Sequence, residues 1–269
     1  MRAAALLLVG LLAALQGGPA RAVTFAAVAS PPRFELAGKP GETVRESVEL
    51  SNADVEPGNY RLFTNDWQLN AGGGPTFQDN LDTSSCRPWV ALERRSVVLN
   101  PNVSRKIRFE VQIPADAPVG ECRFALMVEQ DESTLSKAMA GNLPVPVQGR
   151  IAVIVYLRVG DAAPKLRLVD VRLVDINGQS TPVARVANDG NAHDRLDGVV
   201  AATDADNQRI NFAVSQGPIL PGETRELPFS VYAADANEKP LAKWRVPLRI
   251  KGTLEAESGV KIPLDLQLR

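Results

Sequence analysis

The sequence contains few of the residue types on which enzymes and metal sites depend. Among its 269 residues there are one histidine, His193, and two cysteines, and aromatic residues make up 5%. Two cysteines without a set of histidines are too few for a zinc site. A serine triad would need His193 as its base, and the sequence has no G-x-S-x-G, P-loop or H-E-x-x-H segment. We therefore expect a protein that is not an enzyme and that needs no metal ion or cofactor.

The chain also has no excess of charge of either sign. It carries 30 lysines and arginines against 31 aspartates and glutamates, for a formal net charge of -1, and it has no basic block. Proteins that bind nucleic acid usually present a basic patch or stripe. Nucleic acid is therefore not an expected partner.

Long apolar runs are missing, except at the N-terminus. There, "AAALLLVGLLAAL" follows Arg2, and an Ala-x-Ala pattern ends at Ala22. These features are typical of a secretory signal peptide, here residues 1–22, which is removed after Ala22. The alternative is an uncleaved membrane anchor, but the run is short for a bilayer span. We expect an exported mature protein without a membrane span.

Export decides how the two cysteines, Cys86 and Cys122, are interpreted. In an oxidising compartment a lone pair of cysteines most simply forms a disulfide. A Cys86–Cys122 disulfide is therefore predicted, and two buried free thiols are the alternative.

The remainder of the sequence is typical of an all-β protein with two domains. Proline and glycine number 20 each and separate short stretches of alternating apolar residues. Pro-Gly-Glu-Thr occurs once in each half, and "DAAP" at 161–164 has the composition of a linker. Seven strands in each half predict two tandem immunoglobulin-like β-sandwich domains, 23–160 and 165–269. The predicted strands are 31–36, 43–51, 60–68, 88–99 with a break, 104–113, 122–130 and 143–159, then 166–175, 181–188, 196–204, 209–214, 223–233, 243–253 and 260–268.

Two polar segments are interpreted as connections. "NDGNAHDRLDG" contains His193 with Asp189, Asp194 and Asp197, but its spacing fits no EF-hand loop. Asn, Asp and Gly tolerate positive φ, so a turn is the favoured interpretation over a calcium or catalytic loop. "QDESTLSKAMAGN", before Leu143, has no repeated apolar face and predicts a mobile loop.

The stretch "LPVPVQGRIAVIVYLRVG" from Leu143 to Gly160 predicts one long strand with a charged residue inside it. Odd positions are apolar or Gly throughout, and from 152 to 157 both faces are apolar. Arg150 lies where one-sided burial changes to two-sided burial, and a desolvated guanidinium needs an acceptor. The residues alone favour an internal Asp or Glu as that acceptor. An external carboxylate is the functional alternative.

Three segments resemble a known family. "GRIAVIVYLRV", "PPRFEL" and "ECRFALMVE", in this chain at 149–159, 31–36 and 121–129, are similar to strands of the periplasmic PapD-like pilus chaperones. The resemblance covers roughly residues 30–160, and the second half matches by layout only. It implies two immunoglobulin-like domains in a boomerang arrangement, in a periplasmic protein.

The resemblance also implies a function and its residues. In that family a strand of the first domain is lent to a pilin subunit, whose terminal carboxylate is held by basic residues in the inter-domain cleft. Leu143, Val145 and Val147 fall where the donor side chains would lie, and Arg150 and Arg33 fall in the place of the carboxylate-binding residues. Pilin-like subunits are the implied partners, with an outer-membrane usher as a further candidate. The alternative is a tandem β-sandwich envelope protein with a structural binding role.

Proline interrupts the donor segment. Pro144 and Pro146 have no N–H, and alternate residues of a strand point these groups to the same side. One edge of the segment therefore lacks two hydrogen-bond donors. Prolines of this kind also protect an exposed edge against aggregation.

Overall fold

The structure is a computed structural model, and it describes residues 26–70, 72–83, 85–131, 136–140, 143–147, 149–232 and 243–269, with the backbone alone at 136–140 and 143–147. Within these ranges the regular secondary structure is β-strand, and a 3₁₀ turn at Arg87–Trp89 is the helical element. The predicted all-β fold is confirmed. The predicted signal peptide, 1–22, lies outside the described residues. No helix in the described ranges is long and apolar enough to cross a membrane.

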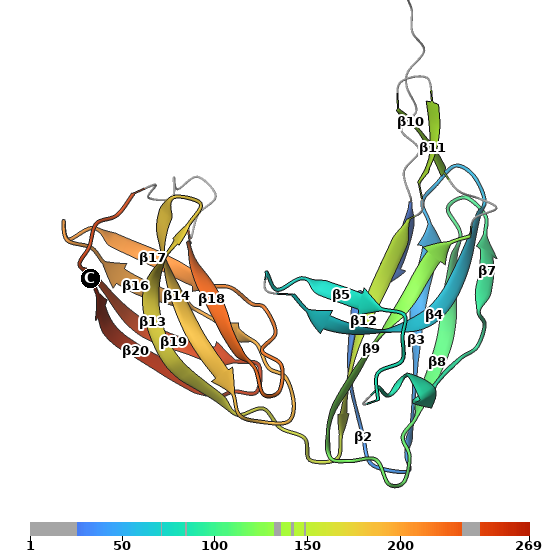
Figure 1. The fold of residues 1–269 in the computed structure, drawn as a ribbon, viewed down its shortest axis with the longest axis horizontal. Coiled ribbons are helices and arrows are strands. Elements are labelled where there is room, and N and C mark those ends of the chain that lie inside the picture. The colour runs from blue at the N-terminus through green and yellow to red at the C-terminus, as the bar shows by residue number, and fades with distance from the viewer. Residues whose placement is uncertain are drawn as a thin grey trace, which may run out of the picture.

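The N-terminal part forms a sandwich of two sheets (Figure 1). One sheet has the order β1 (Ala27–Ser30), β3 (Thr43–Asn52), β8 (Ser104–Gln112), β6 (Val90–Leu92). The other has the order β2 (Arg33–Gly38), β12 (Arg150–Val159), β9 (Gly120–Gln130), β4 (Gly58–Leu69), β5 (Pro75–Gln78), and β7 (Ser96–Leu99) also pairs with β4. Pro31 and Pro32 separate β1 from β2, so the chain changes sheets where two residues lack a ladder donor.

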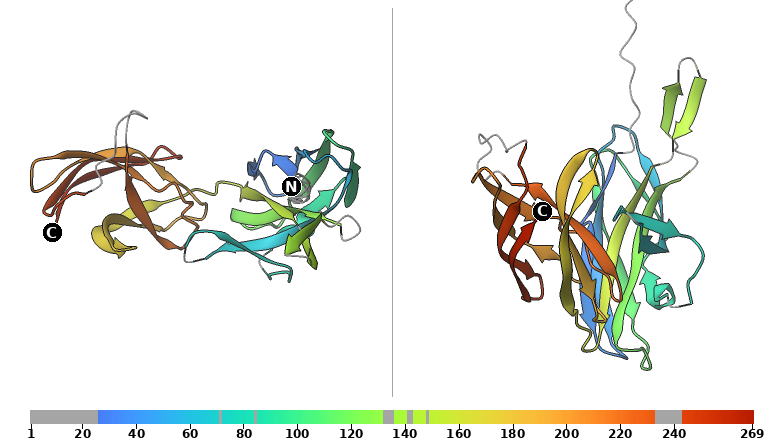
Figure 2. Two further views of the ribbon diagram at one scale, coloured as in Figure 1. Left: turned by 90° about the horizontal axis from the view of Figure 1, so that it is seen from above. Right: turned by 60° about the vertical axis from the view of Figure 1, so that its left-hand side comes forward.

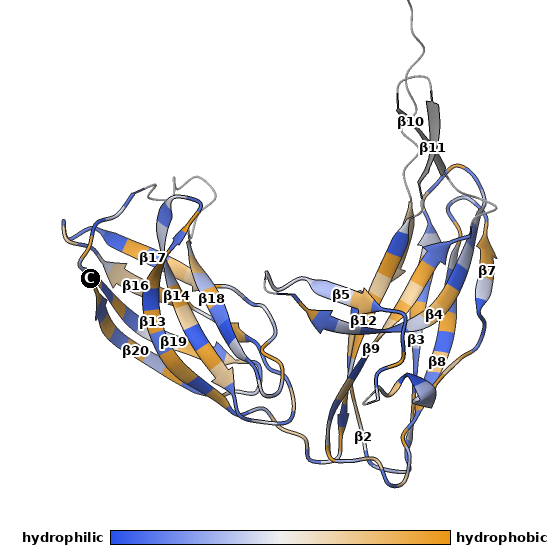
Figure 3. Cartoon of the chain, in the orientation of Figure 1, coloured by the Kyte–Doolittle hydropathy of each residue, from blue (hydrophilic) through white to orange (hydrophobic). Residues whose placement is uncertain are grey.

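Alternation along these strands builds the core between the two sheets. On β12 the odd residues Val153, Val155, Leu157 and Val159 are buried and belong to the main apolar cluster of this sandwich. Figure 3 shows this alternation as orange and blue bands along the strands. Cys86 and Cys122 form a disulfide with Cα atoms 6.1 Å apart, which confirms the predicted pairing.

The segment predicted as one strand from 143 to 159 is two strands. β12 begins at Arg150, opposite Glu129 of β9, and the preceding strand β11 (Leu143–Val147) pairs instead with β10 (Ser136–Ala140). The prediction of a loop before Leu143 was therefore wrong for 136–140. Gly149 lies between the two ladders, and a glycine is a common place for a strand to bend or end. In Figure 1 this hairpin extends beyond the end of the sandwich that lies opposite the linker.

The C-terminal part is a second sandwich, and β18 (Thr224–Val231) belongs to both of its layers. Its residues 224–228 pair with β14 (Gln179–Asn188), and its residues 229–231 pair with β17 (Arg209–Val214). One layer is completed by β13 (Leu166–Ile176), and the other by β16 (Val199–Thr203), β19 (Leu248–Ala256), β20 (Lys261–Leu268) and β15 (Leu196–Asp197). The core of this sandwich is a separate apolar cluster.

Differences from the predicted strands occur where the apolar pattern is short or interrupted. β5 was not predicted, because it is four residues long and follows the glycine-rich turn after Asn70. The strand predicted at 243–253 is β19 at Leu248–Ala256, which begins after Pro247. The strand predicted at 196–204 is divided at Gly198, whose φ of 134° is open to glycine alone.

The two sandwiches form the arms of a V (Figure 1), with the connection at 160–165 at its base. Figure 2 shows each arm from two further directions as a pair of layered sheets. The even-numbered face of β12 turns away from the core of its own sandwich, and Tyr156 on this face packs with Leu220 of the other arm. This face therefore lines the space between the arms.

Candidate functional site

The inter-domain face of the N-terminal sandwich is built from rows of side chains across β4, β9 and β12. Arg150 lies opposite Glu129, and Glu129 lies opposite Arg61. Met127 and Phe63 follow in the next row on the same face. A row of charged side chains, Arg61, Glu129 and Arg150, therefore lies next to a row of apolar side chains on this face.

Arg150 has an internal acceptor, as the residues alone favoured. Its Nε and Nη2 lie 3.0 Å and 2.5 Å from Oε1 of Glu129, while Arg61 bonds the other oxygen of the same carboxylate. The Glu129 side chain is 2% exposed, whereas those of Arg150 and Arg61 are 43% and 61% exposed. Burial alone would raise the pKa of Glu129, but hydrogen bonds from both arginines outweigh it and lower that pKa. The buried carboxylate of Glu129 therefore stays ionised between the two guanidinium groups.

Arg33 lies on the same face but in a different row. It is opposite Ile154 in the parallel pairing of β2 with β12, four residues along the strand from Arg150. Its Nε is 3.0 Å from Oε1 of Glu35, on its own strand. The structure therefore places the two predicted carboxylate-binding residues on one face, each with its own internal acid.

The donor residues lie just beyond this row. The backbones of Leu143, Val145 and Val147 belong to β11, and their side chains lie outside the described residues. Proline cannot donate, so the donors of β11 to β10 are its odd residues, and the even positions 144 and 146 face the other edge. That edge lacks N–H groups at two positions, as the sequence predicted.

The first residues of β12 have one unpaired edge. Residues 150–153 pair with β9 on one side, and β2 joins the other side only from Ile154, whose N–H bonds Pro32 O at 3.1 Å. Within the described ranges no strand pairs with this edge at 150–153. Arg150 and Ala152 share the parity of Ile154, so their N–H and C=O groups point to the open edge.

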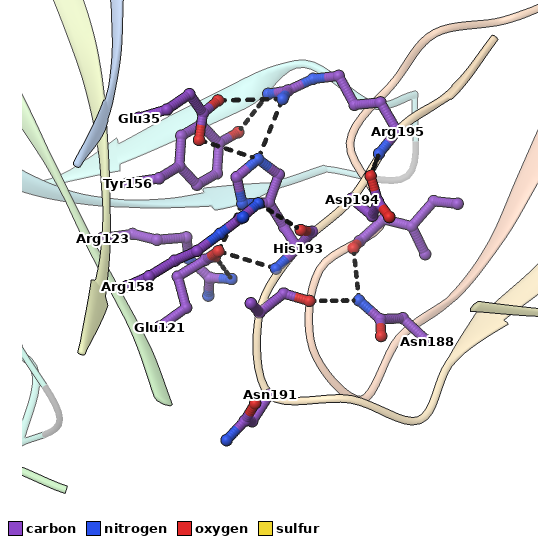
Figure 4. A network of polar contacts seen from close by, with 12 residues as sticks. Glu35, Glu121, Arg123, Tyr156, Arg158, Asn188, Asn191, His193, Asp194 and Arg195 are labelled. Atoms are coloured by element: carbon purple, nitrogen blue, oxygen red, sulfur yellow. Dashed lines mark hydrogen bonds and ion pairs between the residues drawn. The ribbon is translucent and has the colours of Figure 1, made fainter. Parts of the chain in front are cut away.

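A second cluster at the base of the V joins the two sandwiches around His193 (Figure 4). Its ring is fully buried and stacks on Tyr156, with centroids 3.7 Å apart. Nδ1 and the backbone N of His193 lie 2.5 Å and 2.8 Å from Oε2 of Glu121 on β9. Nε2 lies 3.4 Å from Oε2 of Glu35 on β2. The histidine of one arm is therefore held by two strands of the other.

Arg195 completes this cluster from the C-terminal side. Its guanidinium donates to Glu35 at 3.1 Å, to the Tyr156 hydroxyl at 3.2 Å and to Glu257 at 3.4 Å. Burial raises the pKa of Tyr156 to about 12, so the hydroxyl keeps its proton at neutral pH. The backbone adds further bonds, including Glu121 N–H to Asn191 O at 2.8 Å. These contacts connect the two arms at the base of the V.

The pKa of His193 is raised. Burial opposes protonation, but the bonds to Glu121 and Glu35 outweigh it. Arg195 Nη1, 3.0 Å from Nε2, and Arg158, whose Nη2 bonds the His193 carbonyl at 3.3 Å, act against the charged ring. The direct contacts of the ring with the carboxylates of Glu121 and Glu35 outweigh the repulsion from the two arginines. The protonated ring is therefore the form that stabilises the joint.

We predict that this stabilisation is lost as the pH rises. A histidine whose pKa is higher in the folded than in the unfolded protein stabilises the fold fully at pH values below its unfolded pKa, near 6.5. This stabilisation disappears as the pH rises through the pKa of the folded state. The loss is about 1.4 kcal/mol for each unit by which the pKa is raised. Urea unfolding of the wild type between pH 6 and 9 should show the decline, and His193→Gln should show a flatter profile. Equal slopes for both proteins would contradict the assignment.

Little in the sequence indicates this joint between the two sandwiches. The segment around His193 was interpreted as a turn, and it does form bends between β14 and β15. In the described part of the chain no group of three or more His, Cys, Asp and Glu side chains could hold a metal ion. His193, Glu121 and Glu35 are 72 or more positions apart, so only the docked domains bring them together. The available signal was that the chain has a single histidine, with Arg195 two positions after it.

Comparisons with known proteins give no family by sequence but several similar structures. No family model matches the chain, and no curated protein matches it. The solved structure of the YadV chaperone is 12% identical, with a TM-score of 0.48 over 90% of this chain and 100% of that one. The CupB2 chaperone of Pseudomonas aeruginosa is 12% identical, with a TM-score of 0.45 over 90% and 100%. The CsuC–CsuE chaperone–tip adhesion subunit complex of Acinetobacter baumannii is 14% identical, with a TM-score of 0.45 over 90% and 97%.

Proposed function

We propose that this protein is a periplasmic PapD-like chaperone that binds pilus or fimbrial subunits. It would add a strand to the subunit and hold the subunit's terminal carboxylate between the two arms. The open edge of β12 at residues 150–153 carries this proposal, because an unpaired strand edge is where an extended segment can join a sheet. Leu143, Val145 and Val147 would supply apolar side chains to the subunit.

The charged row supports the second part of the mechanism. Guanidinium groups pair with both oxygens of a carboxylate, and Arg150 remains 43% exposed beside Glu129. Arg150, with Arg33 on the same face, would anchor the subunit and so set its register. A register slip of one residue would turn every donated side chain to the opposite face.

The prolines limit where pairing can occur. Because positions 144 and 146 offer no N–H, a client strand can form a full ladder only with the open edge of β12, at residues 150–153. Along β11 the contact would depend on side chains and on the carbonyls of the two prolines. Strand addition in this protein would therefore be concentrated at the first residues of β12.

The test is co-purification of a defined pair. The chain would be produced with its N-terminal segment together with each small secreted protein encoded beside its gene, and isolated from the periplasm. We expect a stoichiometric complex with one of them, and an usher gene nearby would provide the further partner. Isolation of both proteins unbound, with the subunit folded and stable without the chaperone, would overturn the proposal in favour of a structural envelope module.

A further inference from the structure

The glycine-rich turn between β4 and β5 reaches the C-terminal arm at a place separate from the His193 joint. Figure 1 shows this hairpin extending from the N-terminal sandwich toward the other arm, and the view from above in Figure 2 shows the same approach. The contact is with Arg225 of β18: a Cβ atom built on Gly73 would lie 2.1 Å from Nη2 of this arginine. The two arms therefore meet at a second place.

Arg225 presents its guanidinium to the space between the arms. The residue is half-buried at the start of β18, in alternation with Leu227 and Phe229, which belong to the core of the C-terminal sandwich. The guanidinium lies between glycines of the two arms, because a Cβ atom built on Gly217 would also be close, 3.5 Å from Nε. Within the described part of the chain it forms no hydrogen bond and no ion pair. Its contact with the turn is therefore one of packing alone.

The turn that meets Arg225 consists of backbone. Residues 72–74 are all glycine, so no side chain can move aside when the arms approach each other. Gly73 has a φ of 85°, which glycine adopts at little cost. The turn is closed by hydrogen bonds from Gly73 N–H to Asn70 O at 2.9 Å and from Gly74 N–H to Asn70 Oδ1 at 3.0 Å. These bonds hold the tip of the hairpin in one conformation.

A cleft of about 540 Å³ lies beside this contact. The turn lines it from one arm with Gly72 and Gly73, and β18 lines it from the other with Arg225 and Glu226. Packed atoms repel steeply when they are pushed closer, but each pair attracts only weakly. A packing contact across the cleft therefore resists closing of the arms and adds little resistance to their opening.

We propose that the β4–β5 hairpin is a stop that sets the smallest angle between the two arms, with Arg225 as the group that its glycine turn contacts. The linker at 160–165 and the His193 joint would serve as the hinge. Apolar side chains that face the space between the arms, Phe63 and Ile154 among them, favour closing, and the stop would keep this space open. This inference goes beyond the proposed function and does not depend on it.

Pulsed electron-spin resonance between two labels would measure the angle. The labels would be attached to Val55→Cys, 72% exposed between β3 and β4, and to Ala205→Cys, in the exposed turn before β17. The strand registers place both at the ends of the arms remote from the linker. Arg225→Ala should shift the distances to shorter values, because the turn can then approach β18. Arg249→Ala is the control, since Arg249 pairs with Asp265 in the other layer of the same sandwich.

Adding a side chain to the turn tests the stop from the opposite direction. Gly73→Asn should shift the distances to longer values, because asparagine tolerates a positive φ while its side chain needs the space of the guanidinium. The shift should be absent when Arg225→Ala is also present. Gly41→Asn is the matched control: Gly41 has a φ of 86°, and a Cβ atom built on it meets nothing within 4 Å.

Each other outcome overturns the inference. Longer distances in Arg225→Ala would mean that the contact holds the arms together. Unchanged distances in Arg225→Ala or in Gly73→Asn would mean that the hairpin does not limit the approach of the arms. A nuclear Overhauser contact between the α protons of Gly73 and the side chain of Arg225 is expected in the wild type, where no variant has to fold. Its absence would show that the arms do not touch here in solution.

Discussion

Replacing Glu121 by leucine should lower the free energy of unfolding by about 3–5 kcal/mol and loosen the angle between the arms. The Glu121 side chain is fully buried and accepts two bonds from His193. Leucine fills most of the same volume, so the loss comes from unpaired N–H groups and unbalanced charge, with little contribution from a cavity. Arg123, 3.8 Å from the other oxygen of Glu121, would also lose its counter-charge.

The measurement combines stability and shape. Urea unfolding would give the free energy, and small-angle scattering would show whether the maximum dimension changes as the arms separate. Glu110→Leu is the control, because Glu110 pairs with the exposed Arg45 and should cost about 1 kcal/mol or less. If Glu121→Leu costs no more than the control, the buried cluster does not hold the joint.

Alternation made the sandwiches predictable. Residues on β3 and β8 alternate because one face of each strand packs against the opposite sheet, so period and burial coincide. The same regularity predicted most strand positions to within a few residues. It also indicated that 152–157 is covered on both faces, and Tyr156, at 2% exposed, is covered by the other domain.

The joint could not be predicted in this way. Glu121 lies at the start of a strand, and Glu35 alternates with core residues as a solvent-facing residue would. Their burial depends on docking of a second domain, which no local pattern records. A buried acid of this kind is indistinguishable in sequence from an exposed one until its distant partner is known.

For Arg150, the kind of partner could be predicted from the sequence, but the residue could not. An internal acid was the favoured expectation, but identifying Glu129 requires the register of β9 against β12, and that register depends on how the chain between them is folded. That intervening chain contains β10, which has no alternating apolar pattern and, among the described strands, pairs only with β11. Short strands whose pairing is set by their neighbours are poorly encoded by local sequence.

Introducing aspartate at both Val145 and Val147 should abolish client binding and leave the two sandwiches folded. β10 and β11 pair only with each other among the described strands, so neither sandwich core depends on their ladder. In the proposed mechanism the alternating apolar side chains of this segment enter a groove of the subunit. A carboxylate placed there would be desolvated without a partner, which costs several kcal/mol and exceeds what a micromolar complex can lose.

The melting temperature and the client affinity, measured on the same purified variant, decide the outcome. Val98→Asp is a suitable control, because Val98 is 62% exposed on β7, at a different edge of the sheet. We expect the control to fold and to bind as the wild type does. If the double variant unfolds, the hairpin is part of the stable core. If it folds and still binds, the subunit is held by the open edge of β12 and the charged row, and β11 donates nothing.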